Sequence, residues 1–306
     1  MISRQLTALS AAALLILTAC SDPNTADDTD RSDDAESTVD TVSIGSANFP
    51  ESEIIAEIYA QALEAQDVEV DRNFQIGARE VYLPALEDAE IHLMPDYTGN
   101  LLSYLDPETT ATSAEDIEAE LQDALSDQLE ILDPAPAENK DSLNVTPEFA
   151  AEHELESIGD LADLEQVRLA ANPEFAERSY GIPGMEDIYG VTDVDFTAIS
   201  DGGGPATVQA LLDGTVDVAD IYTTTPAIEE HDLVTLADPE EMIAAQFVVP
   251  VIHADAMDDQ VVETLNNVSA VLTTEDLMAM NALNSGEDVQ EPSEIAGDWL
   301  EENDLN

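Results

Sequence analysis

The sequence predicts an α/β protein whose two lobes are joined by two crossing segments. The chain has 306 residues, of which 44% are hydrophobic, so it can bury the core of one large or two ordinary domains. From residue 42 onward, strand-like alternation and helix-like stripes follow one another, beginning with a strand, a helix and a strand. Two irregular stretches, at residues 134–141 and 225–245, divide this pattern into outer and middle parts.

The N-terminus is expected to direct secretion of the protein and then to anchor it to the membrane. Residues 1–19 predict a secretory signal, in which the positive Arg4 precedes an apolar segment too short to span a bilayer. The tetrapeptide Leu-Thr-Ala-Cys that ends at Cys20 resembles the bacterial lipobox, so we favour lipid attachment at Cys20 over an ordinary cleaved signal. Residues 20–41 would be this cysteine and a disordered tether, because residues 21–41 hold eight acids and almost no apolar side chains.

The remaining elements follow in order. Residues 42–46 predict a strand, and Pro50, with acids in the next turn, predicts a helix with an apolar stripe over 54–63. Residues 68–76 predict a second strand. Further helices are expected at 113–129, 147–155 and 258–273, and further strands at 167–171, 216–222 and 247–252. We assign 42–136 and 240–306 to lobe 1, and 137–239 to lobe 2.

Charge and composition exclude several function classes. Asp and Glu total 69 against 7 Lys and Arg, a net charge of −62, and such a surface repels phosphate and disfavours nucleic-acid binding. A single cysteine rules out an internal disulfide and a zinc site built from several thiolates. The four histidines show no close pairing and no GxSxG motif occurs, so we expect no metal, no cofactor and no catalytic residue. The acidity fits either salty surroundings or plain solubility.

An internal echo points to a binding cleft. Residues 85–98 and 210–223 share five of fourteen residues, both beginning with Ala-Leu and ending with Tyr-Thr. Each has the pattern of a helix end, a tight turn and a strand, which would place Tyr97, Thr98, Tyr222 and Thr223 at strand ends, where α/β sheets bind ligands. Two tyrosines facing one cleft can hold a quaternary ammonium, at about 2 kcal/mol or more per desolvated ring. The alternative is a chance echo with structural tyrosines.

Several segments, taken together, resemble the substrate-binding proteins of osmoprotectant ABC transporters, which take up glycine betaine, carnitine, choline and similar compounds. The segments are residues 44–51, 77–80 with 85–86, 95–100, 173–184 with 189–190, and 218–224. The resemblance implies a type II periplasmic-binding-protein fold, two lobes that close on the ligand, and an aromatic cage that includes Tyr97 and Tyr222. It also implies that Asn100 lies near the ligand and that the loop of Ser46, Asn48 and Phe49 borders the cleft.

Two departures from the family pattern concern the cage. Where many relatives have a tyrosine soon after the first crossing, this chain has Asp141, and where many have Pro-Tyr-Asn near the return crossing it has Ala-Gln-Phe, including Gln246. Phe49 or Phe247 would have to replace a missing ring. We hypothesise that Asp141 pairs with a cationic ligand, so that Asp141→Asn weakens choline binding more than betaine binding.

The sequence therefore predicts a solute receptor, without a reaction of its own, on the outer face of the bacterial cytoplasmic membrane. It would be a monomer, held to the membrane by lipid alone, that delivers a quaternary-ammonium or zwitterionic solute to an ABC permease and its ATPase. Asn100, Thr98 and Thr223 would orient the polar end of the solute. Arg79 would either bind a ligand carboxylate or neutralise nearby acids. The alternatives are a same-fold receptor for another metabolite, an extracellular hydrolase, and a surface protein with a vestigial cleft.

Overall fold

The computed structural model describes residues 41–285 and 289–306. The predicted signal peptide, Cys20 and all but the last residue of the predicted tether lie outside the described residues. Within the described ranges, no helix has both the length and the apolar character that a membrane span requires.

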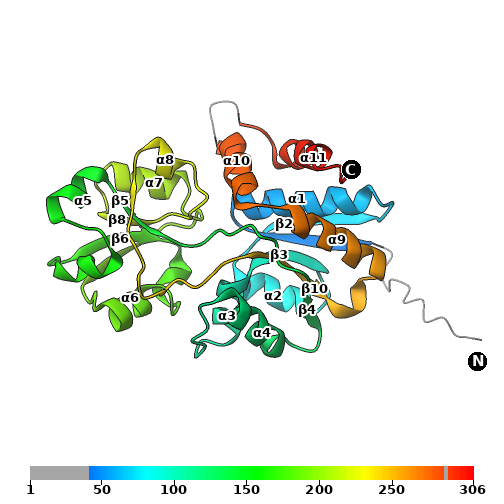
Figure 1. The fold of residues 1–306 in the computed structure, drawn as a ribbon, viewed down its shortest axis with the longest axis horizontal. Helices are drawn as coiled ribbons and strands as arrows, with labels where there is room; N and C mark the ends of the chain where they lie inside the picture. The colour runs from blue at the N-terminus through cyan, green and yellow to red at the C-terminus, as the bar shows by residue number, and fades with distance from the viewer. Residues whose placement is uncertain (1–40, 286–288) are drawn as a thin grey trace, which may run out of the picture. The chain divides into compact units, whose positions relative to one another are not determined.

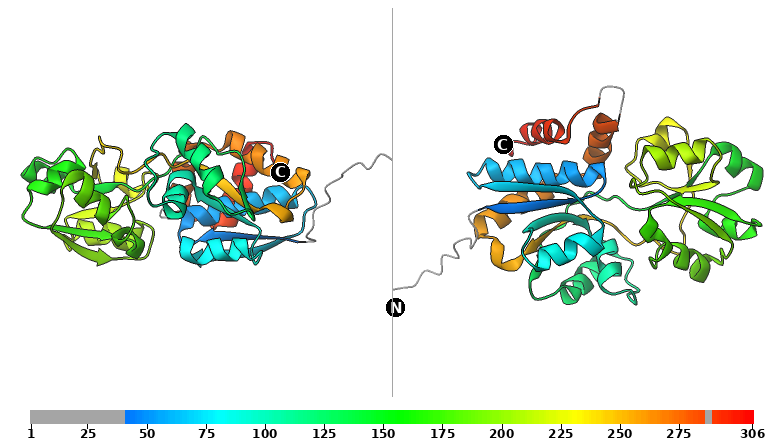
Figure 2. Two further views of the ribbon diagram at one scale, coloured as in Figure 1. Left: turned by 90° about the horizontal axis from the view of Figure 1, so that it is seen from below. Right: turned by 180° about the vertical axis from the view of Figure 1, so that it is seen from behind.

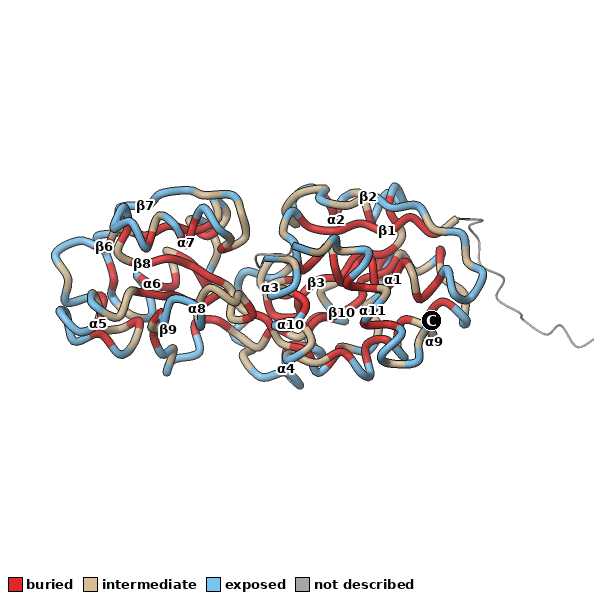
Figure 3. Tube along the Cα trace, turned by 90° about the horizontal axis from the view of Figure 1, so that it is seen from above, coloured by how far each residue is buried: buried red, intermediate tan, exposed pale blue. Residues whose placement is uncertain are grey.

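The first sheet has five strands in the order β2-β1-β3-β10-β4 (Figure 1). Strand β1 (Val42–Ala47) is parallel to β2 (Val70–Gly77) and β3 (Leu93–Tyr97), whereas β10 (Val248–His253) runs antiparallel to β3 and β4 (Leu129–Ile131). Every residue of β1 and β3 is buried, as expected for central strands that helices cover on both faces (Figure 3).

Helices cover both faces of this sheet. One core lies under α1 (Pro50–Glu64), α9 (Asp259–Val271), α10 (Thr274–Ser285) and α11 (Pro292–Glu302). A second core lies under α2 (Arg79–Glu87), α3 (Thr98–Leu105) and α4 (Ala114–Ala124), on the opposite face (Figure 2). Helix α1 begins with Pro50 in its first turn and buries the isoleucines of its apolar stripe completely, as the sequence predicts.

The second sheet has the strand order β7-β6-β8-β5-β9. Its strands are β5 (Leu143–Val145), β6 (Val167–Ala171), β7 (Val194–Ala198), β8 (Val218–Asp220) and β9 (Val234–Thr235). Helices α5 (Pro147–His153) and α6 (Ile182–Tyr189), with the 3₁₀ turns Ile158–Asp163 and Pro173–Ala176, pack into one core, and α7 (Pro205–Leu212) and α8 (Ala227–Glu230) into another.

The chain passes from the first sheet to the second through residues 132–142 and returns through residues 236–247. The two crossing segments touch, because Glu138 and Phe247 form an antiparallel bridge and the Asn139 N–H donates to the Gln246 carbonyl at 3.1 Å. The predicted fold class, two α/β parts joined by two crossing segments, is thus confirmed. The lobe boundaries assigned at residues 136 and 239 stay a prediction.

The internal echo is a structural repeat. Helices α2 and α7 end in the same hydrogen-bonded turn, in which the Ala85 carbonyl accepts from Glu90 N–H at 2.8 Å and the Ala210 carbonyl from Thr215 N–H at 3.0 Å. Ala89 and Gly214 occupy the same position in the two turns, with φ of 55° and 68°. Only this left-handed conformation reverses the chain so tightly, and glycine adopts it without steric cost.

Candidate functional site

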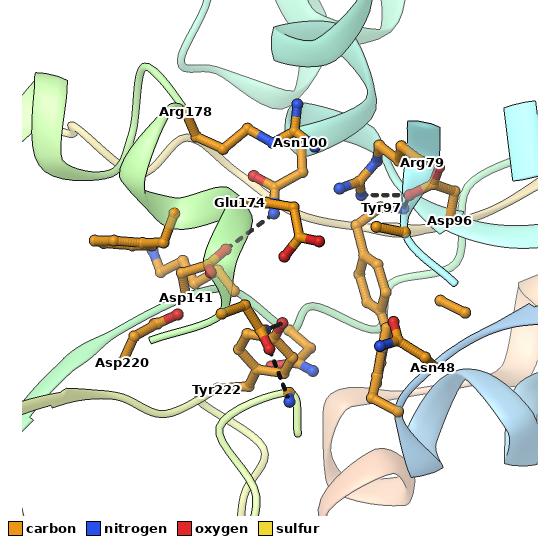
Figure 4. A pocket seen from close by; sticks show the side chains of 18 of the residues that line it. Asn48, Arg79, Asp96, Tyr97, Asn100, Asp141, Glu174, Arg178, Asp220 and Tyr222 are labelled. Carbon is orange, nitrogen blue, oxygen red and sulfur yellow. Dashed lines mark hydrogen bonds and ion pairs between the residues drawn. The ribbon is translucent and has the colours of Figure 1, made fainter. Parts of the chain in front are cut away.

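A cavity of about 100 Å³ is lined by residues from both sheets and from the first crossing segment (Figure 4). It lies where parallel strands end: β1 ends before Asn48, β3 ends at Tyr97, β6 ends before Asn172 and β8 ends at Asp220. Carboxyl ends of strands are the usual binding edge of open α/β sheets. Of the residues predicted from the sequence, the cavity wall contains Asn48, Phe49, Arg79, Tyr97, Asn100, Asp141 and Tyr222.

Aromatic rings form much of the wall: Phe49, Tyr82, Tyr97, Phe175, Tyr180 and Tyr222. The Phe49 ring lies between two of them, with its centroid 6.1 Å from that of Tyr97 and 5.6 Å from that of Tyr222. The contact with Tyr222 is edge-to-face, at 78°. The two tyrosines of the echo thus reach the same cavity, and Phe49 joins them.

A glycine makes room for this arrangement. Gly202, at φ +65°, lies against Phe49, and a Cβ added to it would come 2.7 Å from the Phe49 Cβ. The adjoining turn is held by Asp201, whose carboxylate accepts from the Ala206 N–H at 2.7 Å and the Thr207 hydroxyl at 2.6 Å. The glycine-rich segment at residues 202–204 is therefore a tight turn that opens helix α7.

The hydroxyl groups of the two tyrosines in the internal echo, Tyr97 and Tyr222, are fixed by hydrogen bonds. Tyr97 donates to Glu51 Oε1 at 2.5 Å, and the Tyr222 hydroxyl accepts from Asn172 Nδ2 at 2.9 Å. Burial, together with the Glu51 carboxylate, raises the pKa of Tyr97 well above its ordinary value. Burial, followed by Asp141 and Asp220, does the same to the pKa of Tyr222. Both rings stay neutral, with their faces available for a cation.

Four acids also line the cavity: Asp96, Asp141, Glu174 and Asp220. Asp141 Oδ2 accepts from Asn100 Nδ2 at 2.9 Å. Asp220 is 1% exposed, and its Oδ1 has no hydrogen-bond partner among the described residues. Burial, followed by the neighbouring Asp141, raises the pKa of the Asp220 carboxyl well above its ordinary value. The Glu174 carboxylate points into the middle of the cavity (Figure 4).

The arginines of the wall already have acidic partners. Arg79 pairs with Asp96 at 2.5 Å, and Asp96 also accepts from the Tyr82 hydroxyl at 2.7 Å. Arg178 pairs with Glu80 and lies 5.1 Å from the ring centroid of Tyr104. Of the two roles left open for Arg79, the structure displays the neutralisation of an acid. Its side chain nevertheless borders the cavity, so contact with a ligand is compatible with this pairing.

The other predicted site residues do not form part of the wall. Ser46 Oγ accepts from the Gln75 N–H at 2.8 Å, and the Thr98 hydroxyl accepts from the Phe247 N–H at 3.1 Å. The Thr223 hydroxyl accepts from the Lys140 N–H at 3.1 Å. The Gln246 side chain accepts from the Asn100 N–H at 2.8 Å and donates to Asn100 Oδ1 at 2.6 Å. It therefore orients Asn100, a wall residue, without lining the cavity itself. Phe247, considered as a replacement ring, is also absent from the wall.

Sequence reasoning missed several wall residues with evident chemistry, among them Tyr82, Glu174, Arg178, Tyr180 and Asp220. Two signals were available. Asp220 lies two residues before Tyr222, on the same side of the extended chain, and Glu174 and Arg178 belong to a segment that carried the family resemblance. Tyr180 lies in the same segment, whereas Tyr82 gave no such signal, because it lies on helix α2, whose orientation only the fold determines.

In the described ranges, no three His, Cys, Asp or Glu side chains are grouped so that they could hold a metal ion. The cavity chemistry is therefore that of rings, carboxyl groups and paired arginines. This combination suits a small ligand with a bulky positive group.

Comparisons with known proteins agree with this chemistry. Residues 40–302 match the family model described as the substrate binding domain of ABC-type glycine betaine transport system. The glycine betaine-binding protein YehZ of Escherichia coli is 27% identical over 275 residues, covering 85% of this chain and 90% of that protein. A glycine-betaine-binding protein of Pseudomonas aeruginosa is 27% identical over 293 residues, covering 87% of this chain and 89% of that protein.

Solved structures show the same fold. A glycine betaine/carnitine/choline ABC transporter structure has a TM-score of 0.68 at 21% identity, covering 86% of this chain and 99% of that one. A choline binding protein of an ABC transporter, in complex with choline, has a TM-score of 0.66 at 15% identity, with coverage of 86% and 89%.

Proposed function

This chain belongs to the family of substrate-binding domains of ABC-type glycine betaine transport systems, and we propose that it binds a quaternary-ammonium solute in the aromatic cavity. It is a substrate-binding receptor of an osmoprotectant ABC importer. Receptors of this kind work outside the cytoplasm and hand their solute to a permease. Glycine betaine, choline and carnitine are the solute types that the relatives' names suggest.

The observation that carries the proposal is the contact of Phe49 with both Tyr97 and Tyr222 at the cavity wall. A trimethylammonium group cannot donate hydrogen bonds, so ring faces are its best partners. Three desolvated rings at about 2 kcal/mol each supply about 6 kcal/mol. Micromolar affinity needs about 8 kcal/mol, so polar contacts at the other end of the solute must supply the rest.

Arg79, Arg178 and Asn100 are the proposed contacts for that polar end. All three line the cavity, and each is fixed by another side chain: Asp96, Glu80 and Gln246 respectively. A guanidinium whose orientation is fixed loses little entropy when it also binds a ligand oxygen. Thr98 and Thr223, predicted for this role, would act only through the backbone that they hold.

Attachment and assembly complete the proposal. We propose that Cys20 carries a lipid that holds the receptor on the outer face of the cytoplasmic membrane, and that the receptor is a monomer. A monomer suits delivery, because one receptor must present its bound solute to one permease. Radiolabelled palmitate incorporation that disappears in Cys20→Ala would support the anchor, and labelling that persists would contradict it.

Calorimetry tests the binding proposal. The purified protein is titrated with glycine betaine, choline, carnitine and proline betaine, with an amino acid as the control solute, at low and high salt. We expect binding of at least one quaternary ammonium, lost in Tyr97→Ala and in Tyr222→Ala but kept in Tyr189→Ala, whose ring lies on α6 outside the cavity wall. If the folded protein binds none of these solutes, the same-fold receptor for another metabolite replaces the proposal.

A further inference from the structure

Asp141 and Asp220 form a buried acidic pair in the cavity wall. They are 7% and 1% exposed, and Asp141 lies close enough to Asp220 to raise the pKa of the Asp220 carboxyl, after burial itself. The antiparallel pairing of β5 with β8 brings them together, since Leu143 lies opposite Asp220 and the ladder continues through the bond from Ile221 N–H to the Ser142 carbonyl. Asp141 therefore lies diagonally across the ladder from Asp220, on the same face.

No basic side chain compensates this pair. In the described part of the chain, neither acid has an ion-pair partner, and the nearby Arg79 and Arg178 pair with Asp96 and Glu80 instead. Asp141 receives one amide hydrogen bond, from Asn100. Asp220 Oδ1, fully buried, has no hydrogen-bond partner among the described residues. An orphan oxygen on a buried acid at a cavity wall is a position where a ligand would supply the missing interaction.

Two buried carboxyl groups in contact cannot both ionise without a large cost, because the medium screens their repulsion poorly. They therefore hold one proton between them, as the raised pKa of Asp220 reflects. A cation bound beside the pair offsets the same repulsion that the proton offsets. The proton and the cation thus compete for one site.

We propose that the pair of Asp141 and Asp220 makes this cavity selective for a solute with net positive charge, which displaces the shared proton to solvent when it binds. The inference rests on the proposed function and names its substrate class: a quaternary ammonium without a carboxylate, of which choline is the simplest probe. A zwitterion such as glycine betaine brings its own carboxylate into a wall that also contains Glu174, and both wall arginines are already paired.

Other charged and titratable groups surround the pair and set the background of any pH effect. The described wall contributes Arg79 and Tyr82 from α2, Asp96 and Tyr97 from β3, Lys140 from the crossing segment, Tyr222 beyond β8, and Glu174, Arg178 and Tyr180 from the segment after β6. The tyrosine hydroxyls among them have pKa values raised by burial and so carry no charge near neutral pH. Arg79, Arg178 and Lys140 are the basic side chains of this wall.

Proton release is the direct measurement. The full-length protein is titrated with choline and with glycine betaine in buffers of different ionisation enthalpy, between pH 5.5 and pH 8.5. We expect choline to release up to one proton and to bind more tightly as the pH rises, because fewer protons then compete. Glycine betaine should release less than choline. Equal proton release for the two solutes, or choline affinity independent of pH, would overturn the inference.

Two variants test whether the cation selectivity and the proton release come from the acidic pair. Asp220→Asn and Asp141→Asn each keep the side-chain shape and remove one charge, so choline affinity should fall at least about tenfold while betaine affinity changes less. Choline binding by Asp220→Asn should then release no proton, because the group that holds the proton is gone. Asp195→Asn, on the exposed side of β7, removes the same charge without touching the cavity and should leave both solutes unaffected.

The outcomes separate this inference from the proposed function. If the wild-type protein binds no quaternary ammonium, the proposed function fails. If it binds both solutes and the asparagine variants weaken them equally, the function stands and the cation selectivity is refuted. Should one asparagine variant fail to fold, the other variant and the wild-type proton count still decide the matter.

Discussion

Replacement of Glu51 should destabilise the protein far more than replacement of any exposed acid. Glu51 lies in the first turn of α1 and is 4% exposed. Its carboxylate accepts from the Tyr97 hydroxyl at 2.5 Å and Asn139 Nδ2 at 2.7 Å through Oε1. Through Oε2 it accepts from the Thr224 hydroxyl and Asn281 Nδ2, both at 2.6 Å. These donors come from β3, the first crossing segment, the loop after β8, and α10.

The size of the effect follows from which donors can find another acceptor. In Glu51→Ala, the hydroxyls of Tyr97 and Thr224 can rotate, whereas the amides of Asn139 and Asn281 lose a charged acceptor, and Asn281 keeps only its longer, uncharged contacts to Thr224 at 3.1 and 3.3 Å. At about 2 kcal/mol for each hydrogen bond to a charged group, the two amides predict a loss of about 4 kcal/mol in the free energy of unfolding. Glu51→Gln keeps one acceptor oxygen, so we expect about 2 kcal/mol.

Guanidinium unfolding, followed by the fluorescence of the single tryptophan, Trp299, measures this loss. The matched control is Glu53→Gln, which removes a charge from the same helical turn and one hydrogen bond from Gln75. The control should stay within about 0.5 kcal/mol of the wild type, helped by the reduced self-repulsion of a chain with charge −62. A Glu51→Ala variant within about 1 kcal/mol of the wild type would refute the reasoning.

Three further expectations follow from the site. Phe49→Ala should weaken quaternary-ammonium binding more than about tenfold in calorimetry, because it removes the ring between Tyr97 and Tyr222; unchanged affinity would contradict this role. Gly202→Ala should lower the melting temperature more than Gly190→Ala, since both have positive φ but only the Cβ at Gly202 meets Phe49; equal shifts would show that the contact relaxes freely. The pKa of Asp220 is raised in the folded protein above its value in the unfolded chain, so the protein loses stability as the pH rises from the lower value to the higher. In Asp220→Asn, the melting temperature should therefore fall less over that pH range than in the wild type. Parallel curves of melting temperature against pH would exclude this contribution.

Much of the fold was predictable because its central elements carry strong local patterns. The strand predicted at 167–171 is β6, and the helix opened by Pro50 is α1. The predictions at 68–76 and 258–273 differ from β2 and α9 by one or two residues at each end. Strands β4, β5, β7 and β9 were not predicted; β4, β5 and β9 have only two or three residues, too few to display a period, and their pairing depends on distant partners.

The site was predictable where strand ends determine it and unpredictable where long-range packing does. The echo placed Tyr97 and Tyr222 at one cavity because both halves repeat the same helix-turn-strand unit. Gln246, predicted as a site residue, is not part of the cavity wall, since its side chain bonds to the backbone and amide of Asn100. The pairing of Asp141 with Asp220 could not be read from the sequence, because it depends on the register between β5 and β8.

In the proposed binding mode, the acidic pair and the rings have complementary tasks in selecting a solute. In salty surroundings a buried pair of carboxyl groups alone would attract alkali cations as readily as organic ones. An alkali cation, however, must give up tightly held water to enter, and the ring faces of Phe49, Tyr97 and Tyr222 offer no oxygen ligand in return, since both tyrosine hydroxyls are held by other side chains. A quaternary ammonium holds its water weakly and gains from the ring faces. We therefore expect the carboxyl groups to select the sign of the charge and the rings to select the weakly hydrated cation.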